Sequence, residues 1–174
     1  MVFQDFPLEK QLESINKIYY IIIIMKFLNT LFTTINSKIT QKNKLKDLKY
    51  LIKDYNGTDW KKYIFFLNNT YNRNIVYRNN QIELIIISWN NNQISGIHDH
   101  PKNGCLMKIL DGELDEYVYK KENNNLNLIN IKNFKKDNIG YQENKNGIHN
   151  IINKNNKTVS LHIYSPPNYK STKY

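Results

Sequence analysis

The stretch TVSLHIY at positions 158–164 alternates in character from one residue to the next. Successive side chains of a β-strand point to opposite faces, so the aliphatic residues at 159, 161 and 163 share one face, while Ser160, His162 and Tyr164 share the other. A face turned to solvent would normally carry charged residues. The pattern therefore predicts a strand whose aliphatic face packs against a neighbouring layer and whose polar face lines a cavity.

The chain after about residue 70 has the same β-rich texture. Short apolar and β-branched runs are separated by turn residues such as Asp111-Gly112, a spacing typical of an antiparallel sandwich or barrel. We predict strands near 74–78, 81–89, 93–100, 105–110, 113–120, 126–131, 147–152 and 158–165.

From about residue 8 to 66 the periodicity is helical instead. Apolar residues recur three and four positions apart, in one set formed by Leu12, Ile15, Ile18, Tyr19 and Ile22 and a second formed by Leu45, Leu48, Leu51 and Ile52. The break NGTD at 56–59 predicts a capped short helix through Trp60 and Tyr63. The run YYIIIIM at 19–25 precedes Lys26 and is shorter than the roughly 20 apolar residues of a membrane span, so it predicts a buried helix.

Size and composition narrow the function classes. The 174 residues are 40% hydrophobic and fit one domain, expected here to be mostly β with the N-terminal helices packed outside. The formal charge of +10 comes almost wholly from lysine, since Arg73 and Arg78 are the two arginines. Proteins favour arginine for reading base edges and for binding phosphate through two parallel hydrogen bonds. We therefore expect a solvated basic surface and no specific binding of nucleic acid.

The compartment is also indicated by composition. A single cysteine excludes an internal disulfide framework and is typical of a reducing compartment. The first ten residues, MVFQDFPLEK, lack the basic start and apolar core of a signal peptide. We therefore expect a cytoplasmic protein with no membrane partner.

The four histidines are His98, His100, His149 and His162. In a strand, His98 and His100 would project to the same face and Asp99 to the other, a geometry that suits two ligands on one metal. The alternative is that both are exposed or satisfied within the core. On the polar face of 158–164, Ser160, His162 and Tyr164 would form a hydrogen-bond chain ending in a phenol. With no buried carboxylate to orient the imidazole, this is not a Ser-His-Asp hydrolase arrangement.

Several motifs together resemble eukaryotic-type cysteine dioxygenase, a cupin-fold thiol dioxygenase. They are YNRN at 71–74, SGIHDH at 95–100, Cys105, GIH at 147–149 and SLHIYSPP at 160–167, and their order and spacing match over roughly 47–167. The resemblance implies a cupin-type antiparallel β-barrel or jelly roll. Asn168-Tyr169-Lys170 lacks the cysteine that relatives often carry there, and relatives run on into further strands. These departures from the family pattern leave undecided whether the pocket closes over a substrate and whether the protein is fully active.

The resemblance also implies a metal and substrate site. His98, His100 and His149 would ligate Fe(II), and three neutral imidazoles would leave a cationic centre that favours a thiolate. Arg73 would bind the substrate carboxylate through its planar fork. Tyr71 would either add a hydrogen bond or pack.

A thioether crosslink between Cys105 and Tyr164 is a further implication of the resemblance. His162 and Ser160 would orient the phenol as a second layer around the metal. His162 as a fourth metal ligand is the alternative, against which the resemblance argues. The segment Ser165-Pro166-Pro167 is expected to contain a cis proline bond, and Trp89 is expected in the barrel wall.

The activity implied is oxidation of free L-cysteine with O2 to cysteine sulfinate in cysteine catabolism, by a protein expected to be a monomer. Two alternatives stay open: a dioxygenase of another small thiol such as 3-mercaptopropionate, and a catalytically inactive metal-binding cupin.

Overall fold

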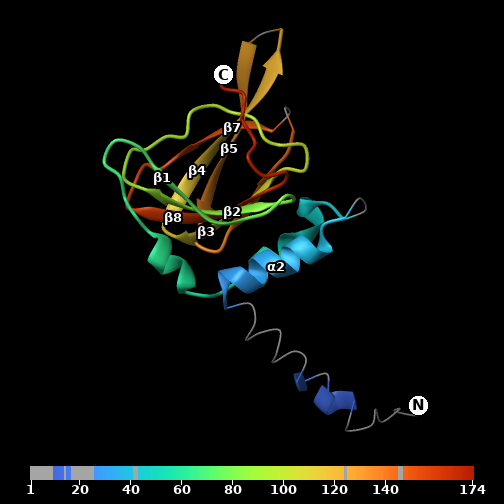
Figure 1. The fold of residues 1–174 in the computed structure, drawn as a ribbon. Helices are drawn as coiled ribbons and strands as arrows, with labels where there is room; N and C mark the ends of the chain where they lie inside the picture. The colour runs from blue at the N-terminus through green and yellow to red at the C-terminus, as the bar shows by residue number, and fades with distance from the viewer. Residues whose placement is uncertain (1–9, 14, 17–25, 41–42, 124, 145–146) are drawn as a thin grey trace, which may run out of the picture.

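The computed structural model describes residues 10–13, 15–16, 26–40, 43–123, 125–144 and 147–174. Within them, eight strands form two antiparallel sheets, with strand orders β1-β2-β8-β3-β6 and β5-β4-β7. The strands are β1 (Asn72–Arg78), β2 (Glu83–Trp89), β3 (Cys105–Asp111), β4 (Glu113–Glu122), β5 (Asn125–Lys135), β6 (Ile139–Gln142), β7 (Ile148–Ile152) and β8 (Thr158–Tyr164). The mostly β, barrel-like architecture predicted from the sequence is confirmed (Figure 1).

Strand β8 lies at the centre of the five-stranded sheet, between β2 and β3. Its register places Ser160 beside Ile87 and Ile109, and His162 beside Ile85 and Met107. The alternate residues Val159, Leu161 and Ile163 belong to a different hydrophobic core. The two faces inferred from alternation are confirmed, because the polar one lines a cavity inside the barrel.

Helices cover the aliphatic face of this sheet from outside (Figure 1). They are α2 (Leu28–Lys38), the 3-10 turn η1 (Leu45–Leu48), α3 (Lys49–Asp54) and the 3-10 turn η2 (Asp59–Tyr63). Leu28, Leu31 and Ile35 of α2 are buried at helical spacing in the same core as Leu161. Lys108 of β3 is buried beneath α3, and its ammonium donates to the Tyr55 carbonyl at 2.6 Å, so a satisfied polar contact also joins the layers.

Several sequence expectations are wrong in detail. The segment near 93–100 is not a strand, because Gly96 has a φ of +73° that breaks the extended backbone; Ile94 and His98 form isolated bridges instead. Strand β6 was not predicted. The expected cap at 58–59 is absent as a side-chain cap on η2; Asp59 instead accepts hydrogen bonds from the Leu28 backbone N–H and the Tyr55 hydroxyl.

The N-terminal helix prediction is only partly within the described residues. Residues 10–13 and 15–16 are helical, and Leu12 and Ile15 are exposed. Ile18, Tyr19, Ile22 and the whole 19–25 run, where a buried helix is expected, lie outside the described residues. No helix in the described ranges combines the length and apolar character needed to span a bilayer.

Candidate metal centre

Three histidines converge at one end of the barrel. His149 lies on β7, and His98 is hydrogen-bonded to it in both directions, N–H to carbonyl at 2.9 and 3.0 Å. His100 follows two residues later. One ring nitrogen of each histidine lies within 4.8 Å of those of the other two, a spacing at which one ion could contact all three.

Each imidazole is held through its Nδ1 atom. Nδ1 of His98 lies 3.0 Å from the Gly96 carbonyl, and Nδ1 of His100 lies 2.7 Å from the Gly147 carbonyl. Nδ1 of His149 lies 2.7 Å from a carboxylate oxygen of Glu116. Since carbonyl and carboxylate oxygens only accept, each Nδ1 is the donor in these contacts, which leaves Nε2 as the atom that can ligate a metal ion. The donor set therefore fits a metal ion.

The local sequence explains this geometry. Gly96 adopts a φ of +73°, which turns its carbonyl back toward His98 and which few other residues would tolerate. Gly147 packs so closely on Glu143 that a Cβ would lie 2.9 Å from the Glu143 backbone nitrogen and oxygen. Both motif glycines thus place a carbonyl against a histidine.

Burial keeps two of these rings neutral. Burial, reinforced by the nearby His149, lowers the pKa of His98 to about 3 and that of His100 to about 2. At neutral pH both rings are unprotonated at Nε2 and available as ligands.

Glu116 is a functional residue that sequence reasoning missed. It lies on β4 and is 2% exposed, and its carboxylate also accepts a hydrogen bond from the Gln142 side chain at 2.9 Å. A signal was present, because Glu116 shares a strand face with the buried Leu114. Its partner, however, lies 33 positions away in the sequence.

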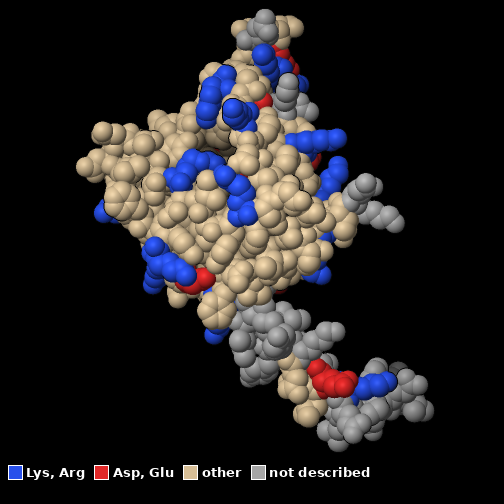
Figure 2. Space-filling view, viewed as in Figure 1, with Lys and Arg blue, Asp and Glu red and all other residues tan. Residues whose placement is uncertain are grey.

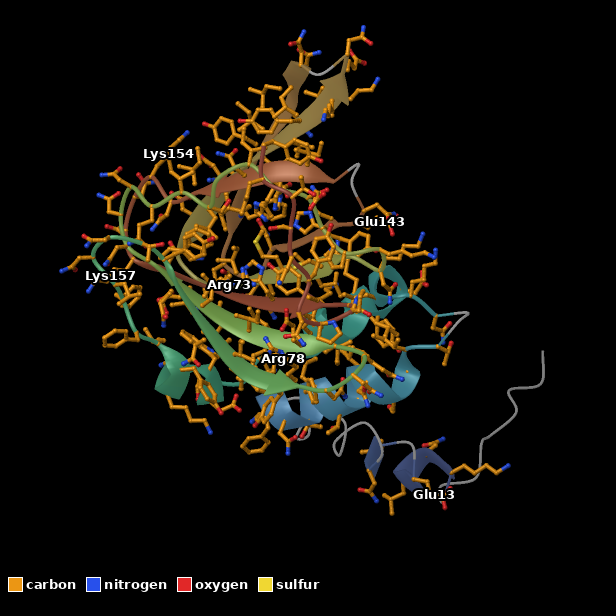
Figure 3. All side chains as sticks on the ribbon, turned by 45° about the horizontal axis from the view of Figure 1, so that its top comes forward. Glu13, Arg73, Arg78, Glu143, Lys154 and Lys157 are labelled. Atoms are coloured by element: carbon orange, nitrogen blue, oxygen red, sulfur yellow. The ribbon has the colours of Figure 1, made fainter. Side chains whose placement is uncertain are left out.

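Arg73 lies on β1 at the edge of the site (Figure 3). One of its guanidinium nitrogens donates to the Tyr164 hydroxyl at 3.4 Å, and the guanidinium lies 5.3 Å from the centre of that ring. Within the described ranges, no carboxylate lies in ion-pair distance of Arg73. Tyr71 stacks on Trp89 with ring centres 4.4 Å apart, so a packing role is visible for it.

The polar face of β8 differs from its predicted hydrogen-bond chain. The Trp89 indole N–H donates to Ser160 Oγ at 2.9 Å, so the Ser160 hydroxyl can donate to His162 Nε2, also at 2.9 Å. The remaining His162 nitrogen, Nδ1, faces the Cys105 sulfur at 3.8 Å. The chain therefore reaches the phenol of Tyr164 through the Cys105 thiol, which interacts with both side chains, rather than directly from His162. Both nitrogens of His162 have partners, and His162 is not part of the three-histidine cluster.

Cys105 and Tyr164 lie directly opposite each other on β3 and β8. Burial raises the pKa of the Cys105 thiol to about 12, so it is protonated at neutral pH. The Ser165–Pro166 bond is cis, as the resemblance implied. One inner cavity is lined by the three clustered histidines together with Tyr71, Arg73, Trp89, Cys105, Glu116, His162 and Tyr164.

The barrel and its three-histidine cluster define a cupin-type fold with a candidate metal site. A double-stranded β-helix protein from Klebsiella pneumoniae superposes with a TM-score of 0.56 at 15% identity, covering 68% of this chain and 90% of that one. A cupin superfamily protein from Desulfitobacterium hafniense gives 0.51 at 13% identity, covering 63% and 89%. These likenesses concern the fold alone.

The family follows from the sequence comparison. The model of the family described as cysteine dioxygenase type I matches residues 24–174, so the chain belongs to that family. It is 32% identical over 116 residues to cysteine dioxygenase type 1 of Homo sapiens, covering 63% of this chain and 58% of that protein. The match to the Danio rerio protein is 30% over 132 residues, covering 71% and 66%. The aligned part thus spans less than two thirds of these relatives.

Proposed function

We propose that the protein is an iron-dependent dioxygenase that oxidises the thiol of free L-cysteine with O2 to cysteine sulfinate. One observation carries the proposal: three imidazoles with free Nε2 atoms line a cavity whose edge holds Arg73, a cation without a carboxylate partner among the described residues. Membership of the family supports the reaction class, and the names of the relatives support the substrate.

His98, His100 and His149 would hold the ferrous ion. Bound there, iron would supply the redox chemistry with dioxygen that no protein side chain provides. Imidazole ligands contribute no negative charge, so the positive charge of the ion would favour a thiol that arrives as its thiolate.

The remaining residues would bind and orient the substrate. Arg73 stays charged and offers a two-pronged donor that matches a carboxylate. Tyr71, stacked on Trp89, would limit the width of the cavity. His162, fixed by Ser160, would position the Cys105 side of the cavity.

A thioether between Cys105 and Tyr164 would be formed by the same chemistry. The sulfur would bond to a ring carbon of the phenol, and dioxygen would accept the two hydrogens lost. The opposed register of the two residues supports this proposal. Intact mass after turnover should fall by two hydrogen atoms, and Cys105→Ser should abolish the change; an unchanged mass in an active enzyme would contradict the crosslink.

The experiment that tests the proposed function is product analysis. Protein loaded anaerobically with Fe(II) is mixed with L-cysteine and then with O2, and sulfinate is measured by mass spectrometry. We expect sulfinate in proportion to bound iron. Faster turnover of 3-mercaptopropionate would reassign the substrate, and iron binding without any product would indicate an inactive cupin.

Replacing Arg73 tests the carboxylate contact. Arg73→Gln should raise KM for L-cysteine roughly 10- to 100-fold, the effect of losing hydrogen bonds between charged groups, while iron content stays unchanged. Cysteamine, which lacks the carboxylate, serves as the control and should be oxidised equally by both proteins. An unchanged KM for cysteine would rule out this contact.

The cellular compartment is inferred from the composition. One buried cysteine suits a reducing compartment, so we propose a cytoplasmic enzyme. We also propose a monomer, which sedimentation would test.

A further inference from the structure

The C-terminal segment, residues 169–174, pairs with the loop that carries His98. The Asp99 backbone N–H donates to the Thr172 carbonyl at 3.3 Å, and the Tyr174 N–H donates to the Ile97 carbonyl at 3.2 Å. Asp99 accepts two more hydrogen bonds through Oδ1, from the Thr172 N–H at 2.7 Å and the Tyr169 hydroxyl at 3.0 Å. The segment is therefore fixed in register against the loop.

This register determines where Lys173 points. His98 and Lys173 are directly opposite in an antiparallel bridge, and the hydrogen bonds of the bridge are made by their neighbours. In such a non-hydrogen-bonded pair the two side chains lie on the same face and close together. Lys173 is thus directed to the face that carries the His98 imidazole.

An outer cavity of about 340 Å³ lies between this segment and the barrel. It shares Tyr71, Arg73, His98 and Tyr164 with the inner cavity, and its other lining residues are Asp99, Tyr169, Lys170, Ser171 and Lys173. Arg73 and His98 therefore stand at the boundary between the two spaces. A ligand held at the histidines could extend past Arg73 into the outer cavity.

The outer cavity is cationic. Figure 2 shows lysine and arginine side chains gathered around a hollow on this face. Arg73 and Lys173 both line this cavity; burial and the nearby Arg73 lower the pKa of the Lys173 ammonium, and the Asp99 carboxylate raises it by a smaller amount. Of the described residues that line the cavity, Asp99 is the single carboxylate; its Oδ1 accepts from two donors, and its Oδ2 is buried without a hydrogen-bond partner. In the described part of the chain, no carboxylate lies within ion-pair distance of either Arg73 or Lys173.

We propose that the outer cavity is a second carboxylate-binding subsite, in which Lys173 and Arg73 together allow the site to accept, besides L-cysteine, thiols that carry two acid groups. The assignment of the substrate as a thiol rests on the proposed function, whereas the subsite rests on the two adjacent cations. Arg73 binds the acid group nearer the sulfur, and Lys173 binds the second. Mercaptosuccinate is a small thiol of this class.

The subsite is tested first without metal or turnover. Chemical-shift titrations of the metal-free protein compare the dianion succinate with the monoanion propionate. We expect succinate to bind more tightly, and Lys173→Met to reduce this preference about fivefold, the upper range for an exposed ion pair. Lys173→Arg should restore the preference.

The control is Lys157→Met, which removes the same charge from a lysine that contacts the Phe66 ring and does not line the outer cavity, so it should leave the preference nearly intact. If both methionine variants lost the preference for succinate equally, the preference would come from general surface charge, and the proposal would be overturned. An unchanged preference in Lys173→Met would overturn it as well.

A second measurement separates this inference from the proposed function. Suppose that iron-loaded protein forms sulfinate from cysteine, and that Lys173→Met leaves the preference for succinate over propionate unchanged. The subsite is then wrong and the proposed function stands. If no thiol is oxidised but the Lys173-dependent preference persists, the subsite stands and the function is wrong. If both hold, kcat/KM for mercaptosuccinate should fall about fivefold in Lys173→Met, with kcat unchanged.

Discussion

The carboxylate of Glu116 lies 2.7 Å from Nδ1 of His149 and is almost wholly removed from solvent. Burial by itself would raise its pKa, but hydrogen bonds from His149 and Gln142 outweigh burial and lower the pKa. The charged carboxylate holds the proton on Nδ1 and makes Nε2 a stronger donor. Glu116 is therefore a positioning residue for the candidate metal centre.

Glu116→Gln should weaken Fe(II) binding about 10- to 100-fold, because the amide keeps the hydrogen bond but removes the charge. Affinity is measured by competition with a chelator under anaerobic conditions. Glu113→Gln is the control, since Glu113 lies on the same strand and its side chain contacts the exposed Asn155 amide. Equal affinities for Glu116→Gln and the unchanged protein would show that this carboxylate does not tune the site.

At the scale of the element, the alternating side chains of β8 contribute to two separate interiors, one on each face of the sheet. Leu161 is fully buried against the helices, while His162 lines the cavity and Ser160 is hydrogen-bonded to it. On the same inner face, strand β2 places Ile85 beside His162 and Ile87 beside Ser160. The strand is therefore held by packing on one face and by hydrogen bonds on the other.

Leu161→Ala should destabilise the protein by about 3 kcal/mol, the usual cost of a cavity left by a buried leucine. Leu128→Ala on β5, where the side chain is 49% exposed, should change stability by less than about 0.5 kcal/mol. Urea denaturation of both variants provides the measurement. Similar losses in the two variants would contradict the assignment of the aliphatic face to the core.

The alternation of aliphatic and polar residues predicted β8, the central strand of the five-stranded sheet. It failed where the structure depends on local backbone geometry or on residues distant in the sequence. The segment at 93–100 reads as a strand, yet the positive φ of Gly96 turns it into a loop paired on one side with His149 and on the other with Lys173. Strand β6 spans only four residues, IGYQ, too few to show a period. The contact of Glu116 with His149 depends on tertiary pairing of β4 with β7, which no local pattern encodes.

At the scale of the whole molecule, the described residues form two hydrophobic cores, of which only the second borders the histidine site. The first lies between the five-stranded sheet and the helices, and the second lies inside the barrel. Burial inside the barrel lowers the pKa values of His98, His100 and His162. The folded protein therefore keeps these three imidazoles neutral, and this lowers its free energy of unfolding in acid.

Acid should destabilise the metal-free protein before any carboxylate titrates. The histidines of the unfolded chain take up protons near pH 6.5, whereas folded His98 and His100 do so only near about 3 and about 2. Between these values the unfolded state binds more protons, so the free energy of unfolding falls as pH drops below about 6.5. Denaturation at pH 7 and 5.5 should show this loss, and His100→Asn should reduce it. Equal stability at both pH values would contradict the lowered pKa values.

The most direct test of the central claim is the Fe(II) stoichiometry of four single-histidine variants, measured anaerobically together with X-ray absorption of the bound metal. We expect one iron per chain with three imidazole nitrogens in its coordination shell. Replacing His98, His100 or His149 by alanine should remove the iron, while His162→Ala should retain it. Loss of iron in His162→Ala, or its full retention in any of the other three, would contradict the account.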